Sequence, residues 1–306
     1  MLTDITIIGG INIDIEGSPF AELRREDSNP GTVTMAFGGV GRNITENLAR
    51  MGARTAMISV IGDDHMGLGA REQLRSLGVD VSLVHSLEGR SSAMYLSILN
   101  HENDMELAIC DMDIISYITP EFLCEHRETL SASGVIALDG NLEEETIRYV
   151  TENFADVPLF LDPVSAAKAV KAKEVIGRFS CIKPNVMEAG ILSDIEIKNE
   201  GDLKKAGSWF IDQGVERLFV TLNKDGVYYK DRRQEGFIRP GKVCINSATG
   251  AGDSFSAAIL FGIEKDMDTR DIARYGMAAS AITMESSSAV NQNISINEIE
   301  RRLTNV

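Results

Sequence analysis

Cysteine and histidine are scarce in this sequence, with four residues of each type among 306. None of them forms the closely spaced pairs, such as CxxC, that zinc sites and disulfide frameworks use. The residues in question are Cys110, Cys124, Cys181, Cys244, His65, His85, His101 and His126. We therefore expect reduced, buried thiols and no metal site built from cysteine or histidine.

Positive charge is also scarce, because 30 lysines and arginines face 46 aspartates and glutamates, which gives a formal net charge of −16. Proteins that bind a nucleic-acid duplex draw most of their affinity from basic side chains that neutralise phosphates. The charge therefore argues against a nucleic-acid partner. It does not exclude a phosphorylated ligand, since backbone amides at a helix N-terminus and Mg²⁺ can hold one.

Long hydrophobic runs and a basic N-terminal segment are missing as well. The opening residues, MLTDITIIGG, contain an apolar run that is too short for a signal peptide or a membrane span. We expect a cytoplasmic protein with no membrane partner. A hydrophobic content of 43% and only 7 prolines are typical of an ordered globular chain, and we expect one folding unit over residues 1–306.

Short β-branched runs alternate with helix-length segments along most of the chain. Apolar residues recur at helical spacing in 41–51 and 202–213, whereas several candidate strands lack the alternation of a half-buried strand. The candidate strands cover residues 5–8, 55–61, 135–138, 159–161, 181–183 and 218–222. This order predicts an α/β fold with a doubly wound, mostly parallel sheet, which binds its ligands at the carboxyl ends of the strands.

Four further candidate strands have no helices between them. They cover about 11–18, 31–38, 91–100 and 104–112, and a polar turn joins the last two. We expect them to form a small separate sheet. Such a sheet needs a cover for one face, so it closes over the active site as a lid or pairs with another subunit.

The strongest local signal is the segment NSATGAGDSFSAAILFG at residues 246–262. Gly250 and Gly252 leave room for backbone N–H groups to approach an anion, and the helix that follows directs its positive end at the same place. Asp253 taken alone suits a helix cap better than a catalytic role. The glycine pair favours the alternative, an acid beside an anion hole. A base at this position needs no raised pKa, but it must be ionised, and the helix N-terminus favours that form.

Two other segments carry polar residues at expected strand ends. GGVGRN at 38–43 is neither a P-loop nor a dinucleotide-binding fingerprint, but it lies near Asn12 and Asp14, which suit vicinal hydroxyls or an Asx turn. KPNVME at 183–188 places Asn185 and Glu188 on one face of a helical turn. These two suit Mg²⁺ ligation, directly or through water, or a capping box.

These segments, with DPVS at 162–165 and VTLNKDGVYY at 220–229, occur in the order and spacing of the ribokinase (PfkB) family of carbohydrate and nucleoside kinases. The resemblance covers nearly the whole chain and implies a ribokinase-like fold and ATP-dependent phosphorylation of an alcohol. Within the family the chain most resembles the pseudouridine kinases, on runs such as DSNPG at 27–31 and GGVGRN. Ribokinases carry lysine at the position of Val40 and a small residue at that of Arg42, which makes ribose the less favoured substrate.

The resemblance implies a role for each position that matches a family motif. Asp253 would accept the proton of the 5′-hydroxyl of pseudouridine, beside an anion hole formed by Gly250, Ala251 and Gly252. Ribosyl hydroxyls would be held by Asn12, Asp14, Gly39 and Asn43. ATP would be bordered by Asn185, Thr221, Gly226 and Thr249, and its adenine would be flanked by residues 279–290. Mg²⁺ would be organised, through water, by Asn185 and Glu188.

The resemblance leaves three matters open. Ser247 stands where many family members carry an aspartate that helps to bind a monovalent cation, so dependence on potassium is open. Ribose, fructose, adenosine and inosine are alternative substrates, and a catalytically inactive ligand-binding protein on this fold is a further alternative. The uncovered face of the small sheet predicts a homodimer formed through the lid.

Overall fold

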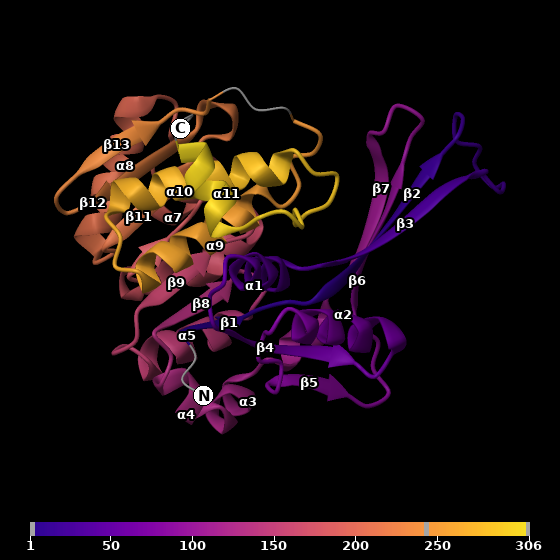
Figure 1. Cartoon of the computed structure of the whole chain (residues 1–306), viewed down its shortest axis with the longest axis horizontal. Helices are drawn as coiled ribbons and strands as arrows, with labels where there is room; N and C mark the ends of the chain where they lie inside the picture. The colour runs from indigo at the N-terminus through magenta and orange to yellow at the C-terminus, as the bar shows by residue number, and fades with distance from the viewer. Residues whose placement is uncertain (1–3, 242–244, 304–306) are drawn as a thin grey trace.

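The computed structural model describes residues 4–241 and 245–303, which form two sheets with helices packed around the larger one (Figure 1). The larger sheet has nine strands in the order β13-β12-β11-β10-β9-β8-β1-β4-β5. Its strands are β1 (Ile5–Ile8), β4 (Thr55–Gly62), β5 (Val84–Leu87), β8 (Val135–Asp139), β9 (Leu159–Asp162), β10 (Cys181–Ile182), β11 (Arg217–Thr221), β12 (Val227–Asp231) and β13 (Glu235–Ile238). Neighbours pair in parallel except at β11–β12 and β12–β13. The predicted doubly wound, mostly parallel sheet is confirmed.

All six strands expected from the sequence are present in this sheet, but the sequence missed β5, β12 and β13. These three lie at or beside the two edges of the sheet. β5 and β13 are only partly buried, so neither carries the continuous apolar run that marks a central strand. The tyrosines of β12 are buried, yet the strand ends in Lys230 and Asp231.

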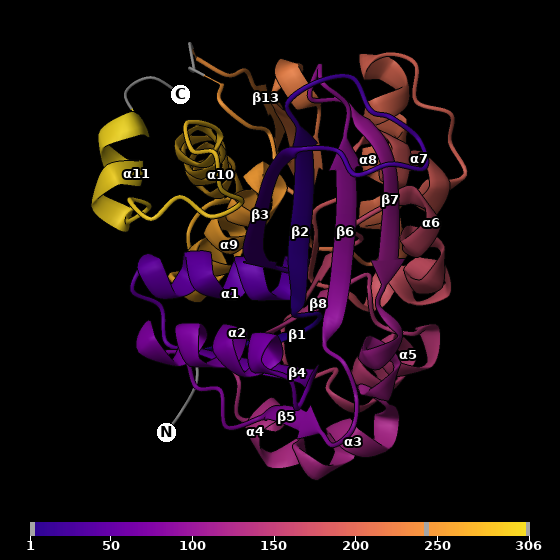
Figure 2. The same ribbon diagram turned by 90° about the vertical axis from the view of Figure 1, so that its right-hand side faces the viewer.

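Helices cover both faces of the larger sheet, and the sheet separates the core into two clusters (Figure 2). Along β1, Ile5 and Ile7 pack in the cluster that contains Leu48 and Phe255, whereas Ile8 packs in the cluster that contains Phe210. The α-helices are α1 (Val40–Arg50), α2 (His65–Ser76), α3 (Pro120–Glu125), α4 (Arg127–Ser131), α5 (Glu144–Asn153), α6 (Ala166–Ala169), α7 (Val186–Ser193), α8 (Glu200–Gln213), α9 (Ala251–Glu264), α10 (Thr269–Met284) and α11 (Ile296–Arg302). Short 3₁₀ helices are η1 (Asp113–Tyr117), η2 (Val170–Arg178) and η3 (Asn223–Asp225).

The smaller sheet projects from the body of the molecule (Figure 1). It has the strand order β3-β2-β6-β7, with β2 and β6 parallel and the outer pairs antiparallel. Its strands are β2 (Asn12–Pro19), β3 (Gly31–Gly38), β6 (Ala93–Leu99) and β7 (Met105–Asp111). This is the four-stranded lid that the sequence predicts, and we call it the lid.

The expectation of buried thiols is wrong for two cysteines. Cys181 is buried in the core, but Cys110 and Cys124 are exposed. Cys110 lies on β7, an edge strand of the lid whose residues are all exposed, and Cys124 lies on the short surface helix α3. Cys244 lies outside the described residues. Within residues 4–241 and 245–303, no helix has the length and apolar character needed to cross a membrane.

Candidate active site

The first turns of α9 adjoin β8, the end of β9 at Asp162 and Lys183 directly after β10, and Asp253 lies in the first turn. Gly250, at the N-cap, has a φ of +78°, and a Cβ atom there would lie 1.8 Å from the carbonyl oxygen of Ala289. Only glycine fits such a position without strain. A helix leaves its first N–H groups without intrahelical partners, so this turn can receive an anion. The Ala251 N–H also makes a long contact, 3.3 Å, with the carbonyl oxygen of Ala248.

Asp253 lies among charged groups that come from separate parts of the chain. Asn43 donates a hydrogen bond from Nδ2 to its Oδ2 atom, over 2.8 Å. Burial and the neighbouring carboxylate of Asp162 raise the pKa of Asp253 to about 7. The helix N-terminus favours the ionised form of Asp253, as expected from the sequence, but loss of solvent and repulsion by Asp162 outweigh it and raise the pKa.

Lys183 is a buried cation beside the anion hole, and no role was predicted for it from the sequence. Its ammonium lies 3.0 Å from Asp162, which also accepts a 2.7 Å hydrogen bond from Ser256. A Cβ atom on Gly252 would lie 3.3 Å from Lys183 Nζ, so the ammonium adjoins the first turn of α9. Although burial opposes the charged form, Asp162 and other carboxylates raise the pKa of Lys183. The signal available in the sequence was a lysine directly after a buried strand.

Asp139, at the end of β8, was also missed. Its side chain is fully buried and accepts backbone hydrogen bonds from Gly10 (2.9 Å), Gly41 (2.8 Å) and Asn141 (2.9 Å). Burial raises its pKa despite these donors. The carboxylate thus links Gly41, at the start of α1, to Gly10, in the loop after β1, by hydrogen bonds. The only sequence signal was an acid at the end of the buried run VIALD.

Asn12, Asp14, Gly39 and Asn43 lie close together, as expected. Asn12 and Asp14 belong to β2 and are joined by a 2.6 Å hydrogen bond from Asn12 Nδ2 to Asp14 Oδ1, so the Asx-turn alternative is wrong. Burial raises the pKa of Asp14. Gly39 has a φ of +102° and caps α1, and its carbonyl oxygen accepts from the Asn43 N–H over 2.7 Å.

Asn185 and Glu188 form the capping box that the sequence left as an alternative. Asn185 Oδ1 accepts from the Glu188 N–H over 2.9 Å, and the Glu188 carboxylate accepts from the backbone N–H (2.8 Å) and Nδ2 (2.7 Å) of Asn185. Across the part of the chain that the structure describes, no three acidic, histidine or cysteine side chains are grouped to hold a metal directly. The oxygens of Glu188 keep further lone pairs, so the arrangement fits Mg²⁺ held through water.

The remaining expected residues border this site from two sides. The Thr221 N–H donates to the carbonyl oxygen of Pro184 over 3.0 Å, which joins the end of β11 to Asn185. Gly226 ends η3, and Thr249 is exposed directly before Gly250. The end of α10 packs behind the anion hole, since Ser280 donates to the carbonyl oxygen of Ala251 over 2.7 Å.

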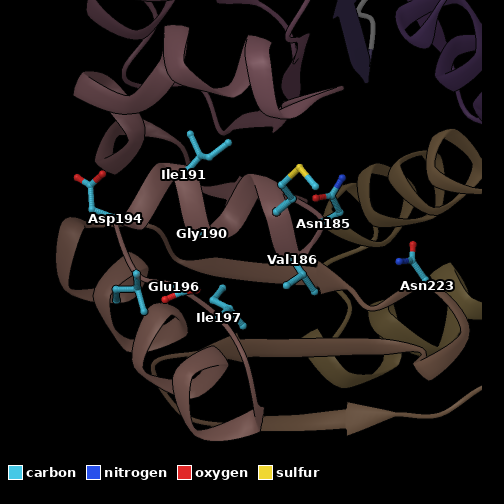
Figure 3. A pocket seen from close by; sticks show the side chains of 10 residues that line it. Asn185, Val186, Gly190, Ile191, Asp194, Glu196, Ile197 and Asn223 are labelled. Atoms are coloured by element: carbon cyan, nitrogen blue, oxygen red, sulfur yellow. The ribbon is translucent and has the colours of Figure 1, made fainter.

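A cavity of about 740 Å³ runs along α7 and opens beside Asn185 and Asn223 (Figure 3). Val186 and Ile197 line its apolar part, and Asp194 and Glu196 lie farther from Asn185. A second cavity, of about 290 Å³, lies between the lid, α1 and α2 and is lined in part by Asp14, Phe37 and Arg42. The first cavity therefore borders Asn185, and the second borders Asp14 and the start of α1.

Comparison with known proteins matches the chain to one family. The model for "pfkB family carbohydrate kinase" matches residues 2–296. Pseudouridine kinase of Escherichia coli is 36% identical over 293 residues, 95% of this chain and 94% of that protein. Guanosine-inosine kinase of Exiguobacterium acetylicum is 28% identical over 92% of this chain and 94% of its own length. A carbohydrate kinase structure from Agrobacterium tumefaciens superposes with a TM-score of 0.88 and 29% identity, covering 99% of this chain and 98% of that one.

Proposed function

The chain belongs to the pfkB family of carbohydrate kinases, phosphotransferases with an alcohol acceptor, and from this premise we propose that it phosphorylates the 5′-hydroxyl of pseudouridine with ATP. The observation that carries the chemistry is Asp253, placed at a helix N-terminus beside the Lys183 ammonium. The similarity to a pseudouridine kinase supports the substrate.

In the proposed reaction, Asp253 accepts the proton of the substrate hydroxyl while the hydroxyl oxygen forms a bond to the γ-phosphorus. The bond between that phosphorus and the bridging oxygen breaks, and ADP leaves with the electron pair. A pKa of about 7 suits this role, because Asp253 is substantially ionised at neutral pH and still binds a proton well. Phosphoryl transfer otherwise requires mainly alignment and stabilisation of charge.

The phosphoryl group is stabilised, in this proposal, by the N-terminus of α9 and by Lys183. Gly250, Ala251 and Gly252 bring backbone N–H groups within reach of its oxygens, and the helix dipole adds a partial positive charge. Lys183 lies against Gly252 and brings a full positive charge to the same place. The Asp162 carboxylate fixes the ammonium without removing its charge.

We assign ATP to the side of the site formed by Asn185, Thr221, Gly226 and Thr249. The cavity along α7 supports this assignment, since it opens beside Asn185 and the loop after β11 (Figure 3). Mg²⁺, when bound with the nucleotide, would neutralise the phosphates and align them for in-line attack. Asn185 and Glu188 would orient its water ligands through the oxygens of the capping box. A requirement for potassium is not part of the proposal, because Ser247 supplies no carboxylate.

The substrate side of the proposal rests on Asn12, Asp14, Gly39 and Asn43. The amide of Asn12 and the carboxylate of Asp14 lie on one strand and already share a hydrogen bond, which suits two vicinal hydroxyls. A primary amide carries two N–H donors, so Asn43 can contact Asp253 and a hydroxyl together. The cavity lined by Asp14 and Phe37 gives room for a group larger than ribose, as a nucleoside requires.

We also propose that the protein acts in the cytoplasm, which supplies ATP, as a homodimer formed through the lid. One face of the lid is apolar across all four strands. Met35, Ile15, Leu96 and Ile109 are paired in one row, and the next row joins Val33, Ile98 and Leu107 through Gly17. Val33 and Ile109 are 75% and 62% exposed. Such a face favours association, and the same face of a second copy is its natural cover.

A coupled assay of ADP release tests the proposed function. The wild type is assayed against pseudouridine, uridine, inosine, adenosine, ribose and fructose with MgATP, and the product is identified as the 5′-phosphate. We expect the highest kcat/KM with pseudouridine and a loss of about 10²–10⁴-fold in kcat for Asp253→Asn. ADP release with none of the substrates would overturn the kinase assignment for this chain. A preference for inosine, which the similarity to a guanosine-inosine kinase makes the second candidate, would overturn only the substrate.

A further inference from the structure

Arg42 is a buried arginine that contacts the neighbour of the proposed base. Its Nη1 atom donates to the carbonyl oxygen of Phe37 and to Asn43 Oδ1, both over 2.8 Å. Its Nη2 atom donates to Glu46 and to Gln73. The guanidinium is therefore held by the end of β3, by its own helix α1 and by α2, and it is only 3% exposed.

The contact with Arg42 decides which way the Asn43 amide points. A guanidinium only donates hydrogen bonds and stays charged, so the oxygen of the amide must face it. The nitrogen then faces the other way, where Nδ2 donates to Asp253 Oδ2 over 2.8 Å. The reverse orientation would set two donors against each other at Arg42 and two acceptors against each other at an ionised Asp253.

We propose that Arg42 is a positioning residue for phosphoryl transfer, which holds the Asn43 amide in the orientation that donates a hydrogen bond to Asp253. The proposal rests on the proposed role of Asp253 as the base. It gives Arg42 a function through Asn43 rather than through the substrate. It also gives a reason for a long basic side chain at this position, where a small residue would leave the amide free to turn.

The chemical consequence concerns the proton on Asp253. The charged and polar groups that act on Asp253 are Asp139 on β8, Asp162 on β9, Lys183 after β10, Asn43 on α1 and, through its charge alone, Arg42. The hydrogen bond from Asn43 favours the ionised carboxylate and opposes the effects of burial and of Asp162. When the amide turns, its oxygen faces the carboxylate and the proton is held more tightly. The base is then ionised only at higher pH.

The test compares the pH dependence of kcat/KM for Arg42→Met, Asn43→Ala and the double variant, with the nucleoside that the wild type prefers. The acid limb is the part of the pH profile in which kcat/KM rises as Asp253 loses its proton. We expect Arg42→Met to move this limb to higher pH by about 0.5–1 unit, so that kcat/KM at a pH below the limb falls about 3–10-fold. Because the Arg42 charge also acts on Asp253 directly, the double variant is decisive. If Arg42 acts mainly through Asn43, most of the shift caused by Arg42→Met disappears in the Asn43→Ala background, and the shift that remains measures the direct effect of the Arg42 charge.

Two further variants keep the test informative if Arg42→Met is poorly folded. Arg42→Lys keeps the charge beside Glu46 but loses the planar fork that reaches Phe37 and Asn43, and we expect the same upward shift. Arg50→Met removes the other arginine partner of Glu46, which binds it over 2.8 Å, and we expect the acid limb to stay where it is in the wild type. Arg50→Met thus measures the effect of weakening the buried ion pair alone.

The proposal is overturned if Arg42→Met shifts the limb equally with and without the Asn43 side chain, or if neither Arg42 variant shifts it. These outcomes are distinct from a failure of the proposed function. If the Asp253→Asn variant retained activity, Asp253 would not be the base and the proposed mechanism would be wrong. If Asp253→Asn were inactive and neither Arg42 variant shifted the acid limb of kcat/KM, only the proposed role of Arg42 would be wrong.

Discussion

At the scale of single residues, Asp253 combines two requirements that oppose each other. A base must be free of its proton before it can accept one, yet the surroundings that position Asp253 raise its pKa to about 7 from its ordinary value of 3.8. Between these two values the folded protein binds the proton more tightly than the unfolded chain does. The free energy of unfolding therefore falls as the pH rises through this window.

Asp253→Asn should stabilise the free enzyme while it lowers kcat by about 10²–10⁴-fold. The neutral amide removes the buried charge, so the gain in Tm over the wild type should grow from pH 5 to pH 8 and reach roughly 2–5 °C. Thermal unfolding at the two pH values, without nucleotide, measures the difference. A gain that is larger at pH 5 than at pH 8 would contradict the raised pKa.

Glu188 gives a second prediction at this scale, about the metal. Glu188→Gln keeps a side-chain oxygen for the capping box but removes the charge near the proposed Mg²⁺ position. We expect the Mg²⁺ concentration for half-maximal activity to rise about 10-fold or more, with a small change in Tm. Glu196→Gln, which lines the same cavity beyond α7, is the matched control and should keep the wild-type Mg²⁺ dependence. If both variants needed the same Mg²⁺ concentration for half-maximal activity, Glu188 would not take part in the metal site.

At the scale of elements, the N-terminus of α9 depends on one glycine. Gly250→Ala would place a Cβ atom 1.8 Å from the carbonyl oxygen of Ala289, at a φ of +78°. The helix start must then shift, and we expect a loss of about 1–3 kcal/mol in the free energy of unfolding and at least 100-fold in kcat. Denaturant unfolding and the ADP-release assay measure both effects.

Gly252→Ala is the matched control for the stability effect. Gly252 lies inside the helix, and the nearest atom to an added Cβ, Lys183 Nζ, would be 3.3 Å away. The free energy of unfolding should stay within about 1 kcal/mol of the wild type, because alanine suits a helix interior. The new methyl group lies between Lys183 and the anion hole, so kcat should still fall. Equal losses of stability in the two variants would argue against the strained start of α9.

At the scale of the whole molecule, the apolar face of the lid predicts the assembly. We expect the wild type to sediment as a dimer at micromolar concentration, and the double variant Leu107→Glu with Ile109→Glu to sediment as a monomer, because charges on this face oppose burial. Ala108→Glu lies on the same strand but on the opposite face, paired with Ser97, and should remain a dimer. A monomeric wild type would refute the proposed homodimer.

The sequence by itself determined the kinds of elements and the positions of the glycines at the two helix starts. Helical periodicity predicts α1 and α8, and buried β-branched runs predict the six central strands, because these patterns depend on residues that are near in the chain. The edge strands β5 and β13 escaped prediction because partial exposure removes the pattern on which a strand assignment depends. The exposure of Cys110 and Cys124, which were expected to be buried, also escaped prediction, because the burial of a single side chain depends on its tertiary neighbours.

Only the tertiary structure decided the electrostatics of the site. Asn43 and Asp253 are 210 residues apart in the chain, Asp162 and Ser256 are 94 apart, and each pair meets only when the sheet and α9 come together. These contacts between distant segments determine three properties of the site: the pKa of Asp253, the ion pair of Lys183 with Asp162, and the orientation of Asn43 by Arg42. Burial and Coulomb interactions depend on distance in space and on exclusion of water, neither of which a local sequence pattern contains.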